Sequence, residues 1–458
     1  MDAIIVREGE KLTLDRQAAR NGMVRRLMQV SDASPFPIFS YSRGVLRAGR
    51  VVGTVTCGHV RIEIHPKTVE RDGTQDREFL LNLLRFSGHL RGYHWARGSV
   101  PQSTAEPIEI LIAEIADDIS AGLREGVPQR YQNIDAEIPT IRGRVNLGRL
   151  STRLPTQHAG IPVRHAPLTI DNHLSRLIKW VAQTLLRVSR SVRTQEKLRA
   201  AINALRMVDL RGFSASEVHS LELSRFESGW QPTLTLARLL LEGSSFNPTL
   251  AGRLDAIAVV FSLERLFERC LRQLLPAALP DAGFSVSHRT DTLYMLTSRE
   301  RGDKAVRIRP DFIYRKDKRA VAVADAKWKR LSHDSVTFGL TPADVYQVSA
   351  YLLRYQLRHA LLLFPKTEWM PGSWSSTYDI PGTGLVVQIV GVDIESLVSP
   401  HEDRHQEALR SLRTLVAFHL TPSTHRKMGH VTDEAVPDHI TTSAWSSRAL
   451  PLEPDQDS

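Results

Sequence analysis

The sequence predicts a multidomain protein of mixed α+β and α/β class. Its 458 residues are too many for one ordinary hydrophobic core. The hydrophobic pattern also changes twice along the chain, from strand-like to helical and then to strands alternating with helices. We therefore expect four segments: a β-rich N-terminal domain over 1–123, a mainly helical middle region over 124–250, an α/β domain over 251–420 and a disordered tail over 421–458.

The N-terminal segment has the period-two alternation of strands. Apolar and polar residues alternate over 44–56 and over 60–65, and glycines separate the two runs. Helical spacing of apolar residues follows over 77–90 and over 107–123. These patterns predict strands first and two helices after them.

The middle segment opens with a basic stretch over 141–147, which reads as loop and strand. Helical periodicity then predicts helices over 174–188, 196–207 and 232–241. Asp171 and Asn172 are alternative N-caps for the first of these helices. Either side chain can accept a hydrogen bond from the amides of the first helical turn.

The third segment alternates between helices and strands. We expect an amphipathic helix over 254–275, which prolines end, and then a hairpin of two strands over 306–314 and 320–327. A helix opened by Thr341-Pro342 follows over 341–357, and two buried strands follow over 361–364 and 385–392. This order of elements is typical of an α/β domain.

The two strands of the predicted hairpin carry the most informative chemistry. Asp311 follows Pro310 on the first strand, and Asp325 and Lys327 lie near the end of the second. Residues i and i+2 of a strand share a face, so Asp325 and Lys327 project together. A carboxylate on an apolar strand is costly unless it is paired or binds a metal. Two carboxylates and a lysine at one point suit Mg²⁺-dependent phosphodiester hydrolysis, with Asp311 and Asp325 as metal ligands.

Lys327 has two possible roles in such a site. Its ammonium group can orient or deprotonate the attacking water, or neutralise the phosphate oxygens. The ordinary alternative for Asp325 and Lys327 is a strand end that emerges into solvent, with the lysine at the surface.

Two helices offer further candidates. Gln347 and Tyr351 are four residues apart on one helix and share a face, where they can position substrate; the alternative is a polar rim. Glu264 and Glu268 share a face of the preceding helix. We prefer Glu268 as an additional catalytic and metal-associated carboxylate, because its surroundings are more apolar. Its alternative is a solvated glutamate, or one paired with an arginine at i,i+4.

Composition limits the class of partner. A net charge of +10 favours a polyanion, and nucleic acid is the commonest; a basic surface that binds nothing is the alternative. The two cysteines, Cys57 and Cys270, lack metal-ligand spacing and fit a reducing cytoplasm. We expect no signal peptide, no membrane span and no nucleotide-binding loop, because none of these patterns occurs.

Four motifs in order resemble the McrC family, the nuclease subunits of McrBC modification-dependent restriction systems. They are Leu266-Phe-Glu-Arg269, Arg309-Pro-Asp-Phe-Ile313, Ala324-Asp-Ala-Lys-Trp-Lys329 and Asp344-Val-Tyr-Gln-Val-Ser-Ala-Tyr351. Two earlier segments, 62–67 and 168–179, are softer matches. The resemblance spans about residues 40 to 395. This chain departs from the family at Ala326 and His65, and the tail after Thr421 is not explained by the resemblance.

The resemblance implies a C-terminal PD-(D/E)xK restriction-endonuclease-like domain. Asp311, Asp325 and Lys327 would be its catalytic set and Mg²⁺ its cofactor. The N-terminal part would dock onto a McrB-like AAA+ GTPase oligomer and stimulate its hydrolysis, and the partner would recognise the methylated DNA that this chain cuts. The lack of a nucleotide-binding loop agrees with that division of labour.

Two other functions stay open at this point. The chain can be a non-catalytic adaptor that activates a partner NTPase, although the intact Asp311, Asp325 and Lys327 argue against a degenerate site. It can also be a stand-alone RecB-like nuclease, which predicts cleavage without any partner.

Overall fold

In this computed structural model, Met1–Leu420 forms one compact unit. The predicted tail over 421–458 lies outside the residues that the structure describes. Within the described part of the chain, no helix is both long enough and apolar enough to cross a membrane. The described residues are 3–14, 22–32, 34, 36–67, 73–87, 107–152, 160–243, 256–279, 284–288, 293–370 and 374–420.

The first sheet has four strands, in the order β1 (Ile4–Arg7), β6 (Val60–His65), β5 (Val51–Cys57) and β12 (Ala256–Ser262). β1 runs parallel to β6, and the other pairs are antiparallel. Side chains alternate between two cores. Val51 and Val55 belong to the core that includes α2 (Met23–Asp32), and Val52 belongs to the core of the helices.

The N-terminal predictions are confirmed with small shifts. The strand over 60–65 is β6, and the run over 44–56 is divided into β4 (Val45–Ala48) and β5. β4 pairs with β2 (Lys11–Leu12) and β3 (Phe39–Ser42) in a second small sheet. The two helices are α3 (Gly73–Phe86) and α4 (Pro107–Glu125). Sequence reasoning missed α2.

The helix predicted over 254–275 is wrong in its first half. Residues Ala256–Ser262 form β12, and α11 (Leu263–Ala278) begins only after the Ser262 side chain caps it. The run Ile-Ala-Val-Val-Phe is rich in β-branched residues, and an apolar run of this length cannot be assigned by periodicity alone. α11 also continues past Pro276. A strand from the predicted third segment thus completes the sheet of the first.

The predicted helices of the middle region are α6 (His173–Val188), α7 (Val192–Ala204) and α9 (Gln231–Gly243), and they are confirmed. The short α8 (Ala215–Ser220) and a 3₁₀ helix, η1 (Arg225–Trp230), lie between α7 and α9. Together with α4 and α11 these helices build one large apolar core.

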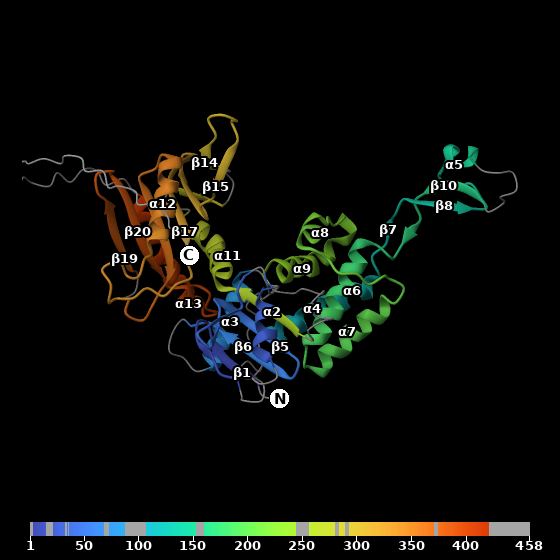
Figure 1. Cartoon of the computed structure of the whole chain (residues 1–458), viewed down its shortest axis with the longest axis horizontal. Helices are drawn as coiled ribbons and strands as arrows, with labels where there is room; N and C mark the ends of the chain where they lie inside the picture. Colours follow the sequence, from blue (N-terminus) through green and yellow to red (C-terminus); the bar gives the residue numbers. More distant parts are fainter. Residues whose placement is uncertain are drawn as a thin grey trace, which may run out of the picture. The chain divides into compact units, whose positions relative to one another are not determined.

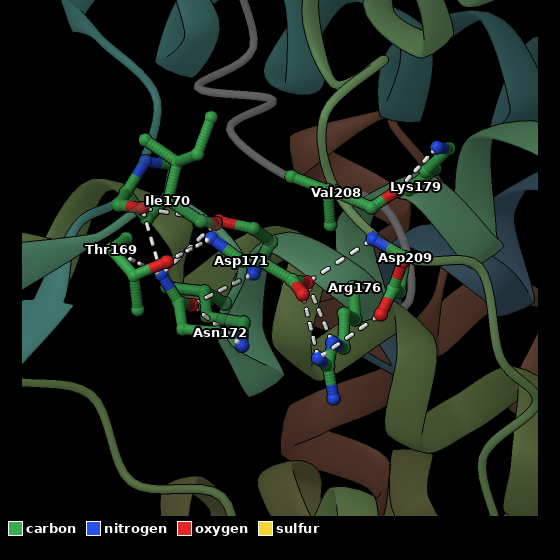
Figure 2. A network of polar contacts seen from close by, with 11 residues as sticks. Thr169, Ile170, Asp171, Asn172, Arg176, Lys179, Val208 and Asp209 are labelled. Carbon is green, nitrogen blue, oxygen red and sulfur yellow. Dashed lines mark hydrogen bonds and ion pairs between the residues drawn. The ribbon is translucent and has the colours of Figure 1, made fainter. Parts of the chain in front are cut away.

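Figure 2 shows why α6 begins where it does. The Asn172 side chain accepts hydrogen bonds from the amides of Leu174 and Ser175, both at 3.1 Å, so Asn172 is the N-cap. Asp171 instead forms a two-point ion pair with Arg176, at 2.6 and 2.7 Å. This ion pair lowers the pKa of Asp171. The conspicuous polar residues of this segment therefore have structural roles.

The middle region also contains strands that the sequence did not predict. β8 (Ile134–Ile138), β10 (Ile161–His165) and β9 (Arg144–Val145) form a three-stranded sheet, which lies beside the short helix α5 (Leu147–Ser151) in Figure 1. β7 (Arg130–Tyr131) pairs with β11 (Leu168–Thr169). Only the strand near 141–147 was expected. The others are short and mostly exposed, so they lack a strong apolar alternation.

The C-terminal sheet has six strands, in the order β13 (Phe284–Ser287), β16 (Phe312–Lys316), β17 (Arg319–Ala326), β18 (His359–Pro365), β20 (Leu385–Val392) and β19 (Trp374–Ile380). The central strands β17, β18 and β20 are parallel. Ala322 and Ala324 share a core with α11, and Val323 shares another with α12 (Pro342–Tyr355). Helices therefore cover both faces of this α/β sheet (Figure 1).

The first strand of the predicted hairpin is not continuous. β15 (Lys304–Ile308) pairs with a separate strand, β14 (Leu293–Thr297), and only β16 pairs with β17. The strand is interrupted between β15 and β16, at Arg309 to Asp311, where Pro310 has no amide hydrogen to donate. The α12, β18 and β20 predictions are confirmed. Two C-terminal helices, α13 (Ile394–Leu397) and α14 (Glu402–Leu420), were not predicted.

Candidate active site

The candidate site lies where the central strand β17 ends. Asp325, the penultimate residue of β17, is 3% exposed. The Lys327 Nζ lies 2.8 Å from the Asp325 Oδ2, as expected for residues that share a strand face. The Lys327 amide donates to the Leu363 carbonyl at 2.9 Å, which continues the parallel pairing with β18. The backbone that carries both side chains is therefore fixed inside the sheet.

Asp311 reaches this point from the break before β16. Its Oδ2 accepts a hydrogen bond at 2.9 Å from the amide of Ala326, the residue between Asp325 and Lys327. The interruption of the strand allows this contact. In a continuous strand, Ala326 would be opposite Pro310 and its backbone would pair there. The structure thus brings the two predicted carboxylates to the same stretch of backbone.

Gln347 and Tyr351 come from α12, which begins with the predicted Thr341 cap and Pro342. The Gln347 Oε1 accepts from the Lys327 Nζ at 2.9 Å, and its Nε2 donates to the Tyr351 hydroxyl at 2.7 Å. The Tyr351 hydroxyl lies 3.4 Å from the Asp325 Oδ1. Four of the predicted site residues therefore form one hydrogen-bonded network.

Electrostatics in this network favour a charged lysine. Burial raises the pKa of Asp325, and the Lys327 ammonium opposes that rise. Burial by itself would lower the pKa of Lys327, but the Asp325 carboxylate outweighs it and holds that pKa above its ordinary value. Burial also raises the pKa of Tyr351, so its hydroxyl stays protonated. These contacts favour the charged form of Lys327, whose ammonium group can neutralise negative charge.

Glu268 is not grouped with the other two carboxylates. It is 7% exposed on α11, and its Oε1 accepts from the Arg272 Nη2 at 2.8 Å, which is the i,i+4 alternative seen in the sequence. Among the residues that the structure describes, no three His, Cys, Asp or Glu side chains lie close enough to bind one metal ion together. A role for Glu268 as a third ligand stays a prediction.

The donor set nevertheless fits magnesium. Mg²⁺ is usually held by one or two carboxylates, with water completing its octahedron. Asp311 and Asp325 supply two carboxylates at one place, and Asp325 is buried enough that a cation would offset the cost of its charge. These two residues are the ones that would hold the ion.

Sequence reasoning missed the contacts of Trp328 and Lys329, the two residues that follow Lys327. The Trp328 indole donates to the Glu8 Oε1 at 2.8 Å, and its ring packs edge-on against Phe267 with centroids 5.6 Å apart. Lys329 pairs with Asp344 at 2.8 Å, at the start of α12. A tryptophan directly after Lys327 was the one available signal. Its partner Glu8 is 320 positions away, so no local pattern could reveal the contact.

The fold and the site define a mixed α/β protein with a buried Asp–Lys centre at the end of a parallel strand. The sequence model of the McrBC 5-methylcytosine restriction system component family matches residues 46–365, which is more than half of the chain. The chain therefore belongs to this family, and the resemblance to McrC found in the motifs is confirmed.

One solved structure shares the fold of this chain. A chain in the tetradecameric assembly of Thermococcus gammatolerans McrB AAA+ hexamers with bound McrC is similar, with a TM-score of 0.61 and 16% identity over 90% of this chain and 100% of that one. A chain in the T. gammatolerans McrBC complex aligns over 61% of this chain and 88% of that one, with a TM-score of 0.44 and 16% identity. A comparison with curated proteins gave no match.

Proposed function

We propose that this protein is the Mg²⁺-dependent DNA endonuclease subunit of a modification-dependent restriction system. It cleaves phosphodiester bonds of methylated DNA when it is complexed with a McrB-like AAA+ GTPase, whose hydrolysis it stimulates. The observation that carries the proposal is the buried network of Asp325, Lys327, Gln347 and Tyr351, with Asp311 bonded to the same backbone. Burying charged side chains in a folded sheet costs free energy, and a role in phosphodiester hydrolysis would explain why they are buried here.

Each residue has a role in the proposed reaction. Asp311 and Asp325 would hold Mg²⁺, which supplies Lewis acidity for the scissile phosphate and for the attacking water. Lys327 neutralises negative charge that develops on the phosphate oxygens, because its ammonium group lies at the same strand end, 2.8 Å from Asp325. Gln347 fixes the Lys327 ammonium by accepting its hydrogen bond. Tyr351 ties α12 to the strand end through Gln347, Asp325 and the Arg309 carbonyl.

The partner is proposed on the family relationship. The similar solved chain comes from an assembly of McrB AAA+ hexamers with bound McrC. This sequence contains no Gly-x-x-x-x-Gly-Lys-Ser/Thr loop, so the GTP-hydrolysing site would be the partner's.

Asp325→Ala tests the site in the assembled system. The purified chain, the McrB-like partner, GTP, Mg²⁺ and a methylated plasmid should give linear product, and the substitution should slow cleavage by roughly a hundredfold or more. Asp379→Ala, an exposed carboxylate on β19, is the matched control and should cleave normally.

Three other results separate the alternatives. Cleavage that survives Asp325→Ala contradicts the proposed site. Stimulated GTP hydrolysis with no cleavage by the unchanged chain identifies an adaptor. Cleavage by the unchanged chain without the partner identifies a stand-alone nuclease.

A further inference from the structure

Two helices of the middle region, α6 and α7, pack against each other, and a groove of about 560 Å³ lies between them. The described residues that line it all come from these two helices and from the residue that follows α7 closely, so the groove is separate from the candidate active site. They are Lys179, Gln183, Leu186 and Arg187 on one side, and Arg199, Ile202, Asn203 and Arg206 on the other.

The groove has an apolar floor and basic sides. Leu186 and Ile202 are half-buried and pack against the large apolar core, which fixes the floor. The other lining residues are four cations and two neutral amides, and none of the described lining residues is acidic. The helical rise separates Lys179 from Arg187 by about 12 Å along α6. The positive charge therefore forms a row along the groove and is not confined to one point.

The charges of these four cations are not neutralised within the described part of the chain. The Lys179 Nζ donates to the Val208 carbonyl (Figure 2), and the Arg199 guanidinium donates to the side-chain oxygen of a glutamine on α7 at 3.1 Å. Both acceptors are neutral. The side chains of Arg187 and Arg206 make no hydrogen bond or ion pair with the described residues. A carboxylate would have to be displaced from none of them before an anion could bind.

Positive charge is concentrated around the groove. Residues 173–206 contain eight Lys or Arg and one Asp or Glu, so they contribute +7 of the net charge of +10. The side chains of Arg187, Arg199 and Arg206 are exposed, and that of Lys179 is half-buried. Like charges in one region repel one another, and a polyanion in the groove would relieve that repulsion.

The lining favours a phosphate backbone as the polyanion. Guanidinium groups match phosphate oxygens with a planar, two-point fork, and the amides of Gln183 and Asn203 can donate further hydrogen bonds. The described lining contains no Phe, Tyr or Trp, which are common anchors in protein interfaces and common stacking platforms for unpaired bases. A row of cations without such anchors suits duplex DNA, which carries one phosphate per roughly 1.7 Å of its axis.

We propose that the groove between α6 and α7 binds the phosphate backbone of duplex DNA through Lys179, Arg187, Arg199 and Arg206. The inference rests on the proposed function, because it takes DNA as the substrate. It adds that this chain holds DNA at a second place, apart from the site where it cuts. Contacts of this kind position DNA without reading its sequence.

The test measures DNA binding by the full chain in EDTA, where no cleavage occurs. A labelled duplex is titrated by fluorescence anisotropy at several salt concentrations. Arg187→Gln plus Arg206→Gln should weaken binding about tenfold or more, because two arginine–phosphate contacts are lost. The slope of log affinity against log salt should fall by about 2, since each phosphate contact contributes roughly 0.9. Arg187→Lys plus Arg206→Lys should keep the slope and weaken binding less, because it keeps both charges and loses the forks.

Arg404→Gln plus Arg410→Gln is the matched control. Both arginines are exposed on α14, so this pair removes the same net charge outside the groove. It should leave affinity and salt slope close to those of the unchanged chain. Glutamine has nearly the helix propensity of arginine, and all four arginines are exposed, so every variant should keep the melting temperature of the unchanged chain.

Four results would overturn the inference. They are an unchanged affinity and slope in the groove variant, an equal loss in the α14 control, no measurable binding of DNA by the unchanged chain at low salt, or labelled poly-glutamate that binds through the groove more tightly than DNA. The last result would identify the groove as a site for an acidic protein.

Failure of the proposed function looks different. In that case DNA binding depends on the groove, but the assembled system shows no Mg²⁺-dependent cleavage. If cleavage depends on Asp325 while DNA binding ignores the groove, the proposed function stands and the inference fails.

Discussion

At the scale of single residues, the burial of the Asp325 carboxylate carries an electrostatic cost. A carboxylate that is 3% exposed is destabilised unless its charge is balanced. Lys327 at 2.8 Å supplies the balancing charge, and Tyr351 supplies a hydrogen bond at 3.4 Å. Gln347 then fixes both partners. The arrangement is pre-organised, because each side chain is held by at least one other before any ligand enters.

Tyr351→Phe removes one hydroxyl and keeps the ring. Gln347 loses its acceptor at 2.7 Å, and the Arg309 carbonyl loses a donor at 3.3 Å. If Asp325 is the metal ligand that we propose, we expect cleavage by the assembled system to slow by about 10- to 100-fold, as for residues that support metal ligands elsewhere. The free energy of unfolding should fall by about 1 kcal/mol. Single-turnover cleavage and urea unfolding measure the two effects.

Tyr346→Phe is the control on the same helix, since that ring is 73% exposed. It should change neither quantity. A normal cleavage rate in Tyr351→Phe would show that the hydroxyl does not support the catalytic residues.

At the scale of elements, β5 and β12 of the N-terminal sheet approach each other closely at Gly53. Gly53 on β5 is opposite Val260 on β12, and its φ is +133°. A Cβ atom at Gly53 would lie 2.2 Å from the Val259 carbonyl oxygen, which is backbone and cannot move aside. Glycine is therefore required there on two grounds, its backbone conformation and the close approach.

Gly53→Ala should destabilise the protein by about 1–3 kcal/mol or more, through strain and the loss of strand pairing. Urea unfolding followed by circular dichroism measures the change. The control is Gly148→Ala in the exposed helix α5, where the nearest atom to a new Cβ is 3.5 Å away and no positive φ occurs. That substitution should be neutral or slightly stabilising. Equal unfolding midpoints for the two variants would contradict the close approach of β5 and β12.

At the scale of the whole molecule, one apolar core joins segments far apart in sequence. Val52 of the first sheet, Leu177 of α6, Phe267 of α11 and Val416 of α14 belong to it. The hydrogen bond from Trp328 to Glu8 adds a polar link at the residue that follows Lys327. The strand end that carries the candidate site is therefore supported by residues near the N-terminus.

A fragment over 263–420 tests this dependence. It retains the six-stranded sheet but loses β12, and it exposes the surface of α11 that packs with α3. We expect it to be insoluble or to melt far below the full chain, because large apolar surfaces would face water. A fragment over 1–420 keeps the whole compact unit and should melt with the full chain. Independent, cooperative folding of 263–420 would contradict a shared core.

The sequence by itself determined much of the local structure and the chemistry. The apolar spacing predicted α4 and α6, since periodicity records which face of an element is buried. The Thr341-Pro342 start predicted α12, and an apolar run predicted β20. The spacing of Asp325 and Lys327 predicted that they project together, because a strand fixes the direction of residues i and i+2. The motif order identified the family.

Only the tertiary structure decided which distant groups meet. It placed Asp311 on the Ala326 amide, joined Trp328 to Glu8, and gave β12 to the N-terminal sheet. These outcomes depend on the pairing of strands and on contacts between residues far apart along the chain. Local sequence patterns record which residues are buried and how they are spaced. They carry no information about which remote segment packs against or pairs with them.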